Sequence, residues 1–163
     1  MSMHGDRLDS IAYLFPGLRE KSSGIGMASV GIQRIFHVPV GPNLLVDGAT
    51  YVGTVWVAPC DGCFVKEIWG TASVAIVGGT NTFAVDNYDA SATAARNLLS
   101  AATVSPITYF TQLSGILIPL TATIANRSMD EGDCINYTLV CGTMTTDGQG
   151  LGLTIVVVTP EIV

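Results

Sequence analysis

The stretch CINYTLVC, which runs from Cys134 to Cys141, carries the clearest secondary-structure signal in the chain. Its residues form two alternating sets, one apolar (Ile135, Tyr137, Leu139 and Cys141) and one more polar (Cys134, Asn136, Thr138 and Val140). An alternation with a period of two is typical of a β-strand that buries one face. The stretch therefore predicts a strand whose apolar set faces a hydrophobic core.

The same alternation recurs on both sides of this strand along the sequence. Residues 151–159 place four apolar side chains on one face: Leu151, Leu153, Ile155 and Val157. Residues 116–124 place five there: Ile116, Ile118, Leu120, Ala122 and Ile124. Pro119 in this segment has no N–H for a ladder, which favours an edge strand. We expect a further strand over residues 33–38.

Two turns suggest how neighbouring strands connect. Asp61-Gly62, a pair favoured in tight turns, predicts a hairpin between residues 51–57 and 64–69. The Thr- and Gly-rich residues 142–150 predict a second hairpin, between the strands that end near Cys141 and begin at Leu151. The Ala-rich residues 91–99 are compatible with a two-turn helix capped by Ser91 or with a loop. Short strands with Gly-rich turns and little helix predict an all-β sandwich or barrel.

The first 29 residues differ in composition from the rest, and we divide the chain into an N-terminal arm, residues 1–29, and a β-sandwich domain, residues 30–163. A disordered tail is one interpretation of the arm. The other is a segment that orders on a neighbouring subunit, which its apolar run favours, since a solvated tail has little use for such residues. The candidate partner-binding residues are Ile11, Tyr13, Leu14 and Phe15.

The charge balance argues against two classes of partner. The 163 residues carry a net charge of -6, and the seven basic residues are scattered, which disfavours nucleic acid. Residues 97–126 hold no charged residue, but Pro106, Pro119 and many Ser and Thr favour β-structure over a membrane helix. We find no secretory signal, because the apolar run after Asp6 and Asp9 is short. Only 12% of the residues are charged, where roughly 25% is ordinary. Either much of the surface consists of Thr, Ser, Ala, Asn and Gly, or part of it is covered by partners.

Catalytic and metal-binding patterns are weak. The two histidines, His4 and His37, have no nucleophile at a suggestive spacing, so we predict no enzyme activity, cofactor or small-molecule substrate. The acidic residues 130–133 lack the spacing of a calcium loop and are interpreted as a solvated turn.

The four cysteines are Cys60, Cys63, Cys134 and Cys141. A zinc site would need all four thiolates on one tetrahedron, and strand periodicity sends Cys134 and Cys141 to opposite faces. Cys60 and Cys63 flank a turn and could face each other. We predict free thiols, with zinc and a Cys60–Cys63 disulfide as the alternatives.

Several segments together resemble a family of viral proteins. They are the run VAPCDG at 57–62 leading into FVKEIW at 64–69, the Ala-, Thr- and Gly-rich middle, the Gly132-Asp133 turn and the last strand, LTIVVV at 153–158. Over about residues 50–158 the chain resembles small head decoration, or cement, proteins of tailed bacteriophages. No catalytic residues carry over from that family.

The resemblance implies a jelly-roll-like antiparallel β-sandwich, often a homotrimer, on the outer surface of the phage head. It would bind the major capsid protein, reinforce contacts between capsid subunits, and be assembled in the host bacterial cytoplasm. The alternative is a carbohydrate- or receptor-binding module of a phage fibre or adhesin. For sugar binding, Tyr88 and Tyr109 are the candidate loop aromatics, because Trp56 and Trp69 fall within strands. A small-barrel hydrolase or isomerase fits least well.

Overall fold

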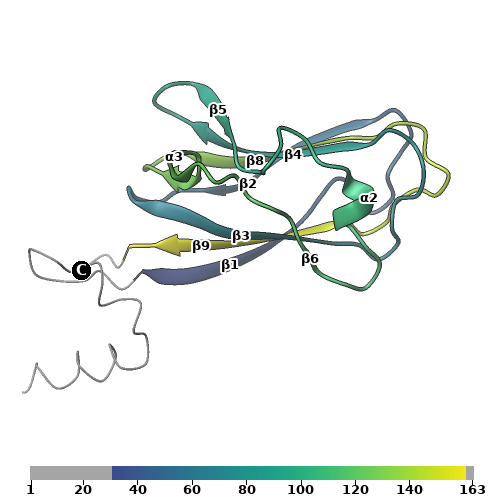
Figure 1. Ribbon diagram of the computed structural model, residues 1–163, viewed down its shortest axis with the longest axis horizontal. Helices are drawn as coiled ribbons and strands as arrows, with labels where there is room; N and C mark the ends of the chain where they lie inside the picture. The colour runs from purple at the N-terminus through teal and green to yellow at the C-terminus, as the bar shows by residue number, and fades with distance from the viewer. Residues whose placement is uncertain (1–30, 161–163) are drawn as a thin grey trace, which may run out of the picture.

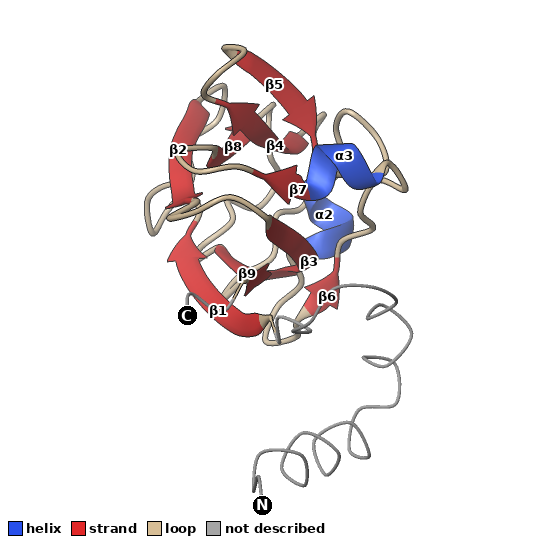
Figure 2. Cartoon of the chain, turned by 90° about the vertical axis from the view of Figure 1, so that its left-hand side faces the viewer, coloured by secondary structure: helices blue, strands red, loops and turns tan. Residues whose placement is uncertain are grey.

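Two antiparallel β-sheets packed face to face make up the part of the protein that a computed structural model describes, residues 31–160 (Figure 1). The strands are β1 (Ile32–Pro39), β2 (Thr50–Val57), β3 (Cys63–Thr71), β4 (Thr82–Asp89), β5 (Ala94–Asn97), β6 (Ile116–Leu117), β7 (Ser128–Met129), β8 (Cys134–Val140) and β9 (Gly152–Thr159). Two single-turn helices, α2 (Pro106–Tyr109) and α3 (Ile124–Arg127), lie on the side opposite β1 and β2 (Figure 2). The predicted arm and its four candidate residues lie outside the described range.

The order of strand pairing identifies the fold. Strand β1 pairs with β9, β2 with β8, β3 with β6 and β7, and β4 with β5, all antiparallel. This nesting is that of one long ribbon doubled back on itself and rolled up, which is a jelly roll. The roll gives one sheet in the order β1-β9-β3-β6, with β7 also on β3, and a second in the order β2-β8-β4-β5. The predicted jelly-roll-like antiparallel β-sandwich is confirmed.

The two predicted hairpins are wrong, although the turns exist. Strands β2 and β3 lie in different sheets, and so do β8 and β9. Gly62 has the positive φ, 77°, that the Asp-Gly pair predicted. The turn carries the chain from one sheet to the other, because β2 pairs with β8 and β3 pairs with β9, both distant in sequence.

Two other segments also differ from expectation. Residues 94–97 form strand β5 rather than a helix or a loop, because they pair with β4. The expected strand over 116–124 shrinks to β6, which does lie at a sheet edge. After Ile118 the chain leaves β3 for the 98–100 segment: the Ser100 N–H donates to the Pro119 carbonyl, and the Thr121 N–H donates to that of Leu98.

The core lies between the two sheets. Strand β8 buries Ile135, Tyr137 and Leu139, as its alternation predicted. The largest fully buried side chains come from both sheets and from the segments that link them, and include Phe83, Phe110, Leu45, Ile68, Ile76, Leu98, Ile118 and Leu153. Within residues 31–160 no helix is both long and apolar enough to cross a membrane.

Candidate functional site: the outer face of the β1-β9-β3-β6 sheet

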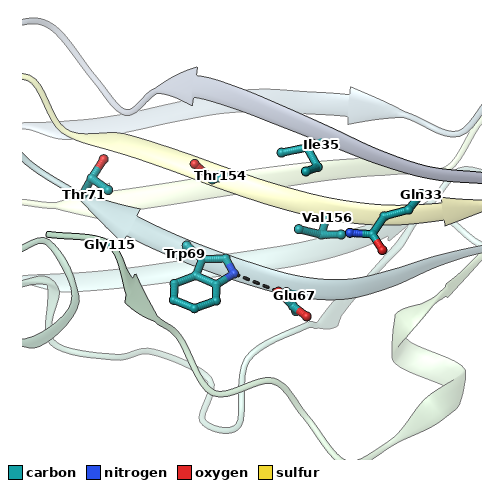
Figure 3. A pocket seen from close by; sticks show the side chains of 8 residues that line it. All are labelled: Gln33, Ile35, Glu67, Trp69, Thr71, Gly115, Thr154 and Val156. Carbon is teal, nitrogen blue, oxygen red and sulfur yellow. Dashed lines mark hydrogen bonds between the residues drawn. The ribbon is translucent and has the colours of Figure 1, made fainter.

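A shallow groove of about 360 Å³ runs across the solvent side of the β1-β9-β3-β6 sheet (Figure 3). Its lining comes from β1, β3, β9 and the turn before β6, and comprises Gln33, Ile35, Glu67, Trp69, Thr71, Gly115, Thr154 and Val156. Strand β1 is the edge of this sheet, so the groove is bordered by a strand with one unpaired side among the described residues. We call these eight residues the outer-face groove.

A β-bulge in β3 decides which side chains reach the groove. The pairing of β3 with β9 shifts between Val65 and Glu67, so Lys66 is an extra residue on β3. Before the bulge, Cys63 and Val65 face the core, and after it Ile68 does. The shift therefore turns Glu67 and Trp69 outward, since one inserted residue exchanges the two faces of a strand.

Arg127 of α3 stabilises this bulge. Its Nε donates to the Val65 carbonyl at 2.9 Å, and its Nη2 donates to the Lys66 carbonyl at 3.2 Å. The guanidinium also lies 4.5 Å from the centre of the Phe64 ring. Arg127 thus supplies hydrogen-bond donors at the point where the regular ladder is interrupted.

The groove has a mainly apolar floor. Ile35 of β1 is opposite Val156 of β9, and Trp69 of β3 is opposite Leu117 of β6. Ile35 is 65% exposed and Leu117 is 48% exposed. Val156 between them is buried, so the exposed apolar side chains lie on β1 and β6, with the half-buried Trp69 beside Leu117. Exposed apolar side chains gathered on one sheet face are typical of an interaction surface.

The polar groups of the groove are partnered with one another. The Trp69 Nε1–H donates to Glu67 Oε2 at 3.0 Å, and the Lys66 ammonium lies 3.8 Å from Glu67 Oε1. The side chain of His37, which lies in β1 as predicted, hydrogen-bonds Thr154 Oγ1 through Nδ1 at 2.9 Å. The single carboxylate of the groove is therefore already compensated, and a partner can cover it without burying an unpaired charge.

The outer face of the β2-β8-β4-β5 sheet is chemically different. Its side chains are small and mostly neutral: Thr50, Val52, Thr54, Asn136, Thr138, Thr82, Ala84 and Asp86. Burial raises the pKa of the Asp86 carboxyl above its usual range. Val52, at 69% exposure, is its most exposed large apolar residue. This face offers a control surface for experiments on the groove.

Comparisons with known proteins leave the family open. No family model matches the chain, and no curated protein matches it. Among solved structures, the chain is similar to a chain of the Cyanophage Pam1 capsid asymmetric unit, with 16% identity and a TM-score of 0.44. The match covers 86% of this chain and 94% of that one.

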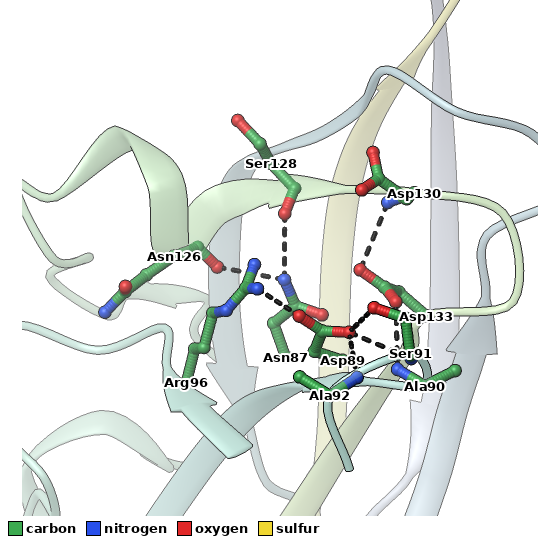
Figure 4. Close-up of polar contacts among 10 residues, drawn as sticks. All are labelled: Asn87, Asp89, Ala90, Ser91, Ala92, Arg96, Asn126, Ser128, Asp130 and Asp133. Carbon is green, nitrogen blue, oxygen red and sulfur yellow. Dashed lines mark hydrogen bonds and ion pairs between the residues drawn. The ribbon is translucent and has the colours of Figure 1, made fainter. Parts of the chain in front are cut away.

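A polar cluster at the end of β4 holds the neighbouring turn (Figure 4). The Asp89 carboxylate accepts hydrogen bonds from the Ser91 hydroxyl at 2.7 Å and from the backbone N–H groups of Ser91 and Ala92 at 2.9 Å each. It also forms an ion pair with Arg96 of β5. These donors, the Ser91 hydroxyl first, lower the pKa of Asp89. The cluster shapes the β4–β5 turn, and every oxygen of Asp89 is used in doing so.

The acidic turn at 130–133 is only partly solvated, which corrects the interpretation from sequence. Asp133 is buried, and its carboxylate accepts hydrogen bonds from the backbone N–H groups of Ala90 and Asp130, both at 3.1 Å. Asp130 and Glu131 are exposed. Because both Asp133 oxygens accept hydrogen bonds from backbone N–H groups, this carboxylate stabilises the turn. Nearby, the buried Asn87 amide donates to the carbonyls of Asn126 and Ser128, at 3.2 and 2.9 Å.

Cys134 and Cys141 face opposite sides of the strand, as its periodicity predicted. The Sγ atoms of Cys60 and Cys63 face each other at 3.8 Å, both as thiols. Burial, together with Cys60, raises the pKa of Cys63 to about 11. Cys141 is buried in the core, while Cys134 lies on the opposite side of β8. Across residues 31–160 no three His, Cys, Asp or Glu side chains are grouped to hold a metal ion.

Sequence reasoning placed the candidate aromatics incorrectly. Tyr88 lies within β4 and Tyr109 within α2, so neither belongs to a loop. Both tryptophans do lie in strands, but only Trp69 lines the groove, while Trp56 packs against Phe36 with ring centres 5.6 Å apart. Sequence periodicity does not predict the outward position of Trp69, because an unbroken strand would place its side chain on the same side of β3 as Val65. The arm residues predicted to bind a partner lie outside the described range.

Proposed function

We propose that the chain is a capsid cement protein, which binds the outer surface of a phage head and reinforces contacts between major capsid subunits. The observation that carries the proposal is the set of apolar side chains in the outer-face groove, bordered by the edge strand β1. The resemblance of residues 50–158 to decoration proteins supports it. The protein would act by binding and not by catalysis.

The physical role of such a protein is to stabilise a joint. A protein that binds two capsid subunits only while they are in contact shifts the equilibrium toward the closed joint. Each large apolar side chain that becomes fully covered contributes about 1.5–3 kcal/mol. Repetition of modest contacts around a symmetric shell then multiplies their effect. In this proposal a homotrimer binds the shell through the groove, the β1 edge, and the arm residues Ile11, Tyr13, Leu14 and Phe15.

Binding to expanded shells that lack the protein tests this function. Full-length protein should co-sediment with the shells and raise the temperature at which they open. Ile35→Asp, at an exposed groove position, should weaken both effects. Val52→Asp is the matched control, since it places the same charge on the opposite outer face. If the two variants bound the shells equally well, the groove would have no part in attachment. Failure of the unaltered protein to bind would reject the cement function itself.

One observation favours the alternative, a carbohydrate- or receptor-binding module. Trp69 lies beside Glu67, Gln33 and Thr154 in one groove, and an aromatic ring with polar neighbours suits the apolar face and hydroxyl groups of a sugar. In this case a glycan array should detect binding that Trp69→Ala abolishes and Trp56→Phe leaves intact.

A further inference from the structure

We propose that in the free protein the outer-face groove is covered by the chain's own N-terminal segment, Ile11–Phe15. This inference goes beyond the cement function and does not depend on it, because it concerns the protein before any partner is bound. It gives one occupant to an apolar face that no described element covers.

The position of the groove at the start of the described chain supports a cis contact. Gln33 and Ile35, two of its lining residues, lie on β1, the first strand of the described chain. The 17 residues from Pro16 to Ile32 can span roughly 55–60 Å when extended. Three interstrand steps separate β1 from β6, about 14 Å in all. The segment can therefore reach every part of the groove from the β1 side.

The chemistry of the two surfaces is compatible. The groove offers Ile35, Val156 and Trp69 across adjacent strands (Figure 3). The segment offers four large apolar side chains, and residues 11–18 carry no charge. Glu67 is already paired with Trp69 and Lys66, so docking leaves no carboxylate stranded. Contact would bury the exposed Ile35 side chain against the apolar side chains of the segment.

Tethering favours the protein's own segment over that of a second copy. Attachment through a tether of this length holds the segment near the groove at an effective concentration on the order of millimolar. At micromolar protein concentrations a neighbour's segment competes poorly. The contact would also be reversible, so that a surface with greater affinity for the segment or the groove could displace it.

The two tryptophans allow a direct test in the full-length chain. Trp56→Phe leaves Trp69 as the single reporter of the groove. Trp69→Phe leaves Trp56, which is half-buried against Phe36 and does not line the groove. In the Trp56→Phe background, Leu14→Asp with Phe15→Asp should shift Trp69 emission to the red and raise its acrylamide quenching severalfold. The same substitutions in the Trp69→Phe background should leave Trp56 emission unchanged. A synthetic peptide of residues 8–18, in excess, should restore the protection of Trp69.

Three outcomes would overturn the proposal. The first is a Trp69 that is quenched equally in chains with and without the arm substitutions. The second is a protection of Trp69 that falls on dilution together with dissociation of an oligomer in sedimentation, because the occupant would then belong to a neighbouring copy. A parallel change at Trp56 would mean that the substitutions disturb the sandwich, and this too would count against docking in the groove.

Discussion

Replacing Phe110 by Ala should remove a central contact between the two sheets. Phe110 is fully buried just after α2, and its ring meets Phe83 of β4 edge-on with centres 4.9 Å apart. On its other side it adjoins β3 at Gly70, where an added Cβ would lie 3.4 Å from the Phe110 ring and 2.5 Å from the Tyr109 carbonyl oxygen. The Phe110 side chain thus joins both layers of the sandwich through a segment that belongs to neither.

The expected loss is that of truncating a buried aromatic ring, which leaves a cavity in the core. Truncation of a buried Phe to Ala costs about 3–5 kcal/mol, against a typical free energy of unfolding of roughly 5–15 kcal/mol for a domain. For a domain of this size the melting temperature should fall by roughly 6–20 °C.

Urea unfolding, followed by circular dichroism, measures the change. Leu113→Ala is the matched control, because Leu113 lies three residues away in the same linking segment but is 87% exposed, and it should change stability by less than about 0.5 kcal/mol. A Phe110→Ala chain within about 1 kcal/mol of the unaltered protein would contradict the role of this segment in the core.

Three further predictions concern single groups. Hydrogen bonds within its turn lower the pKa of Asp89, so its contribution to stability is present at neutral pH and is lost as the pH falls below about 4 toward the folded pKa. Urea unfolding at pH 7 and at pH 3 should therefore show a smaller loss of stability in acid for Asp89→Asn than for the unaltered protein. Because burial raises the pKa of Cys63 to about 11, mass spectrometry after brief alkylation of the native protein at pH 8 should find Cys60 modified first and Cys63 spared; equal rates would contradict this order. Arg127→Ala removes the side-chain donors from the two carbonyls of the bulge, so it should lower the free energy of unfolding in urea by about 1–2 kcal/mol and increase the quenching of Trp69. A loss of stability without any change in Trp69 quenching would mean that Arg127 does not influence the groove.

The sequence predicted the strands more accurately than their partners. The alternation over 134–141 and 151–159 correctly placed β8 and β9 and most of their inward faces. It could not place them in opposite sheets, because a turn sequence such as Asp61-Gly62 specifies a local reversal and says nothing about which ladder the next strand joins. In a jelly roll the partners are distant in sequence: β1 pairs with β9 and β2 with β8.

The predictions for the short elements were wrong for a related reason. Residues 94–97 are rich in Ala and carry no strand signal, yet they form β5 because the Asp89 cluster turns the chain back along β4. Asp133 was interpreted as a solvated turn residue, since nothing in the sequence shows that its carboxylate would meet the backbone N–H of Ala90. Both outcomes depend on contacts between segments, which local propensity does not contain.

The bulge in β3 connects the irregular part of the fold to the proposed surface. Without the extra residue Lys66, the phase of the strand set by Val65 would carry Glu67 and Trp69 into the core and turn Ile68 outward. A Trp–Glu pair inside an apolar sandwich would bury a carboxylate, at a cost in free energy that the Trp69 hydrogen bond alone would not offset. The insertion instead exposes an apolar ring on the sheet face that strand β1 borders, and Arg127 supplies donors to the backbone that the insertion leaves unpaired. The outward position of Trp69, on which the proposed surface depends, therefore rests on one inserted residue and on the arginine that stabilises it.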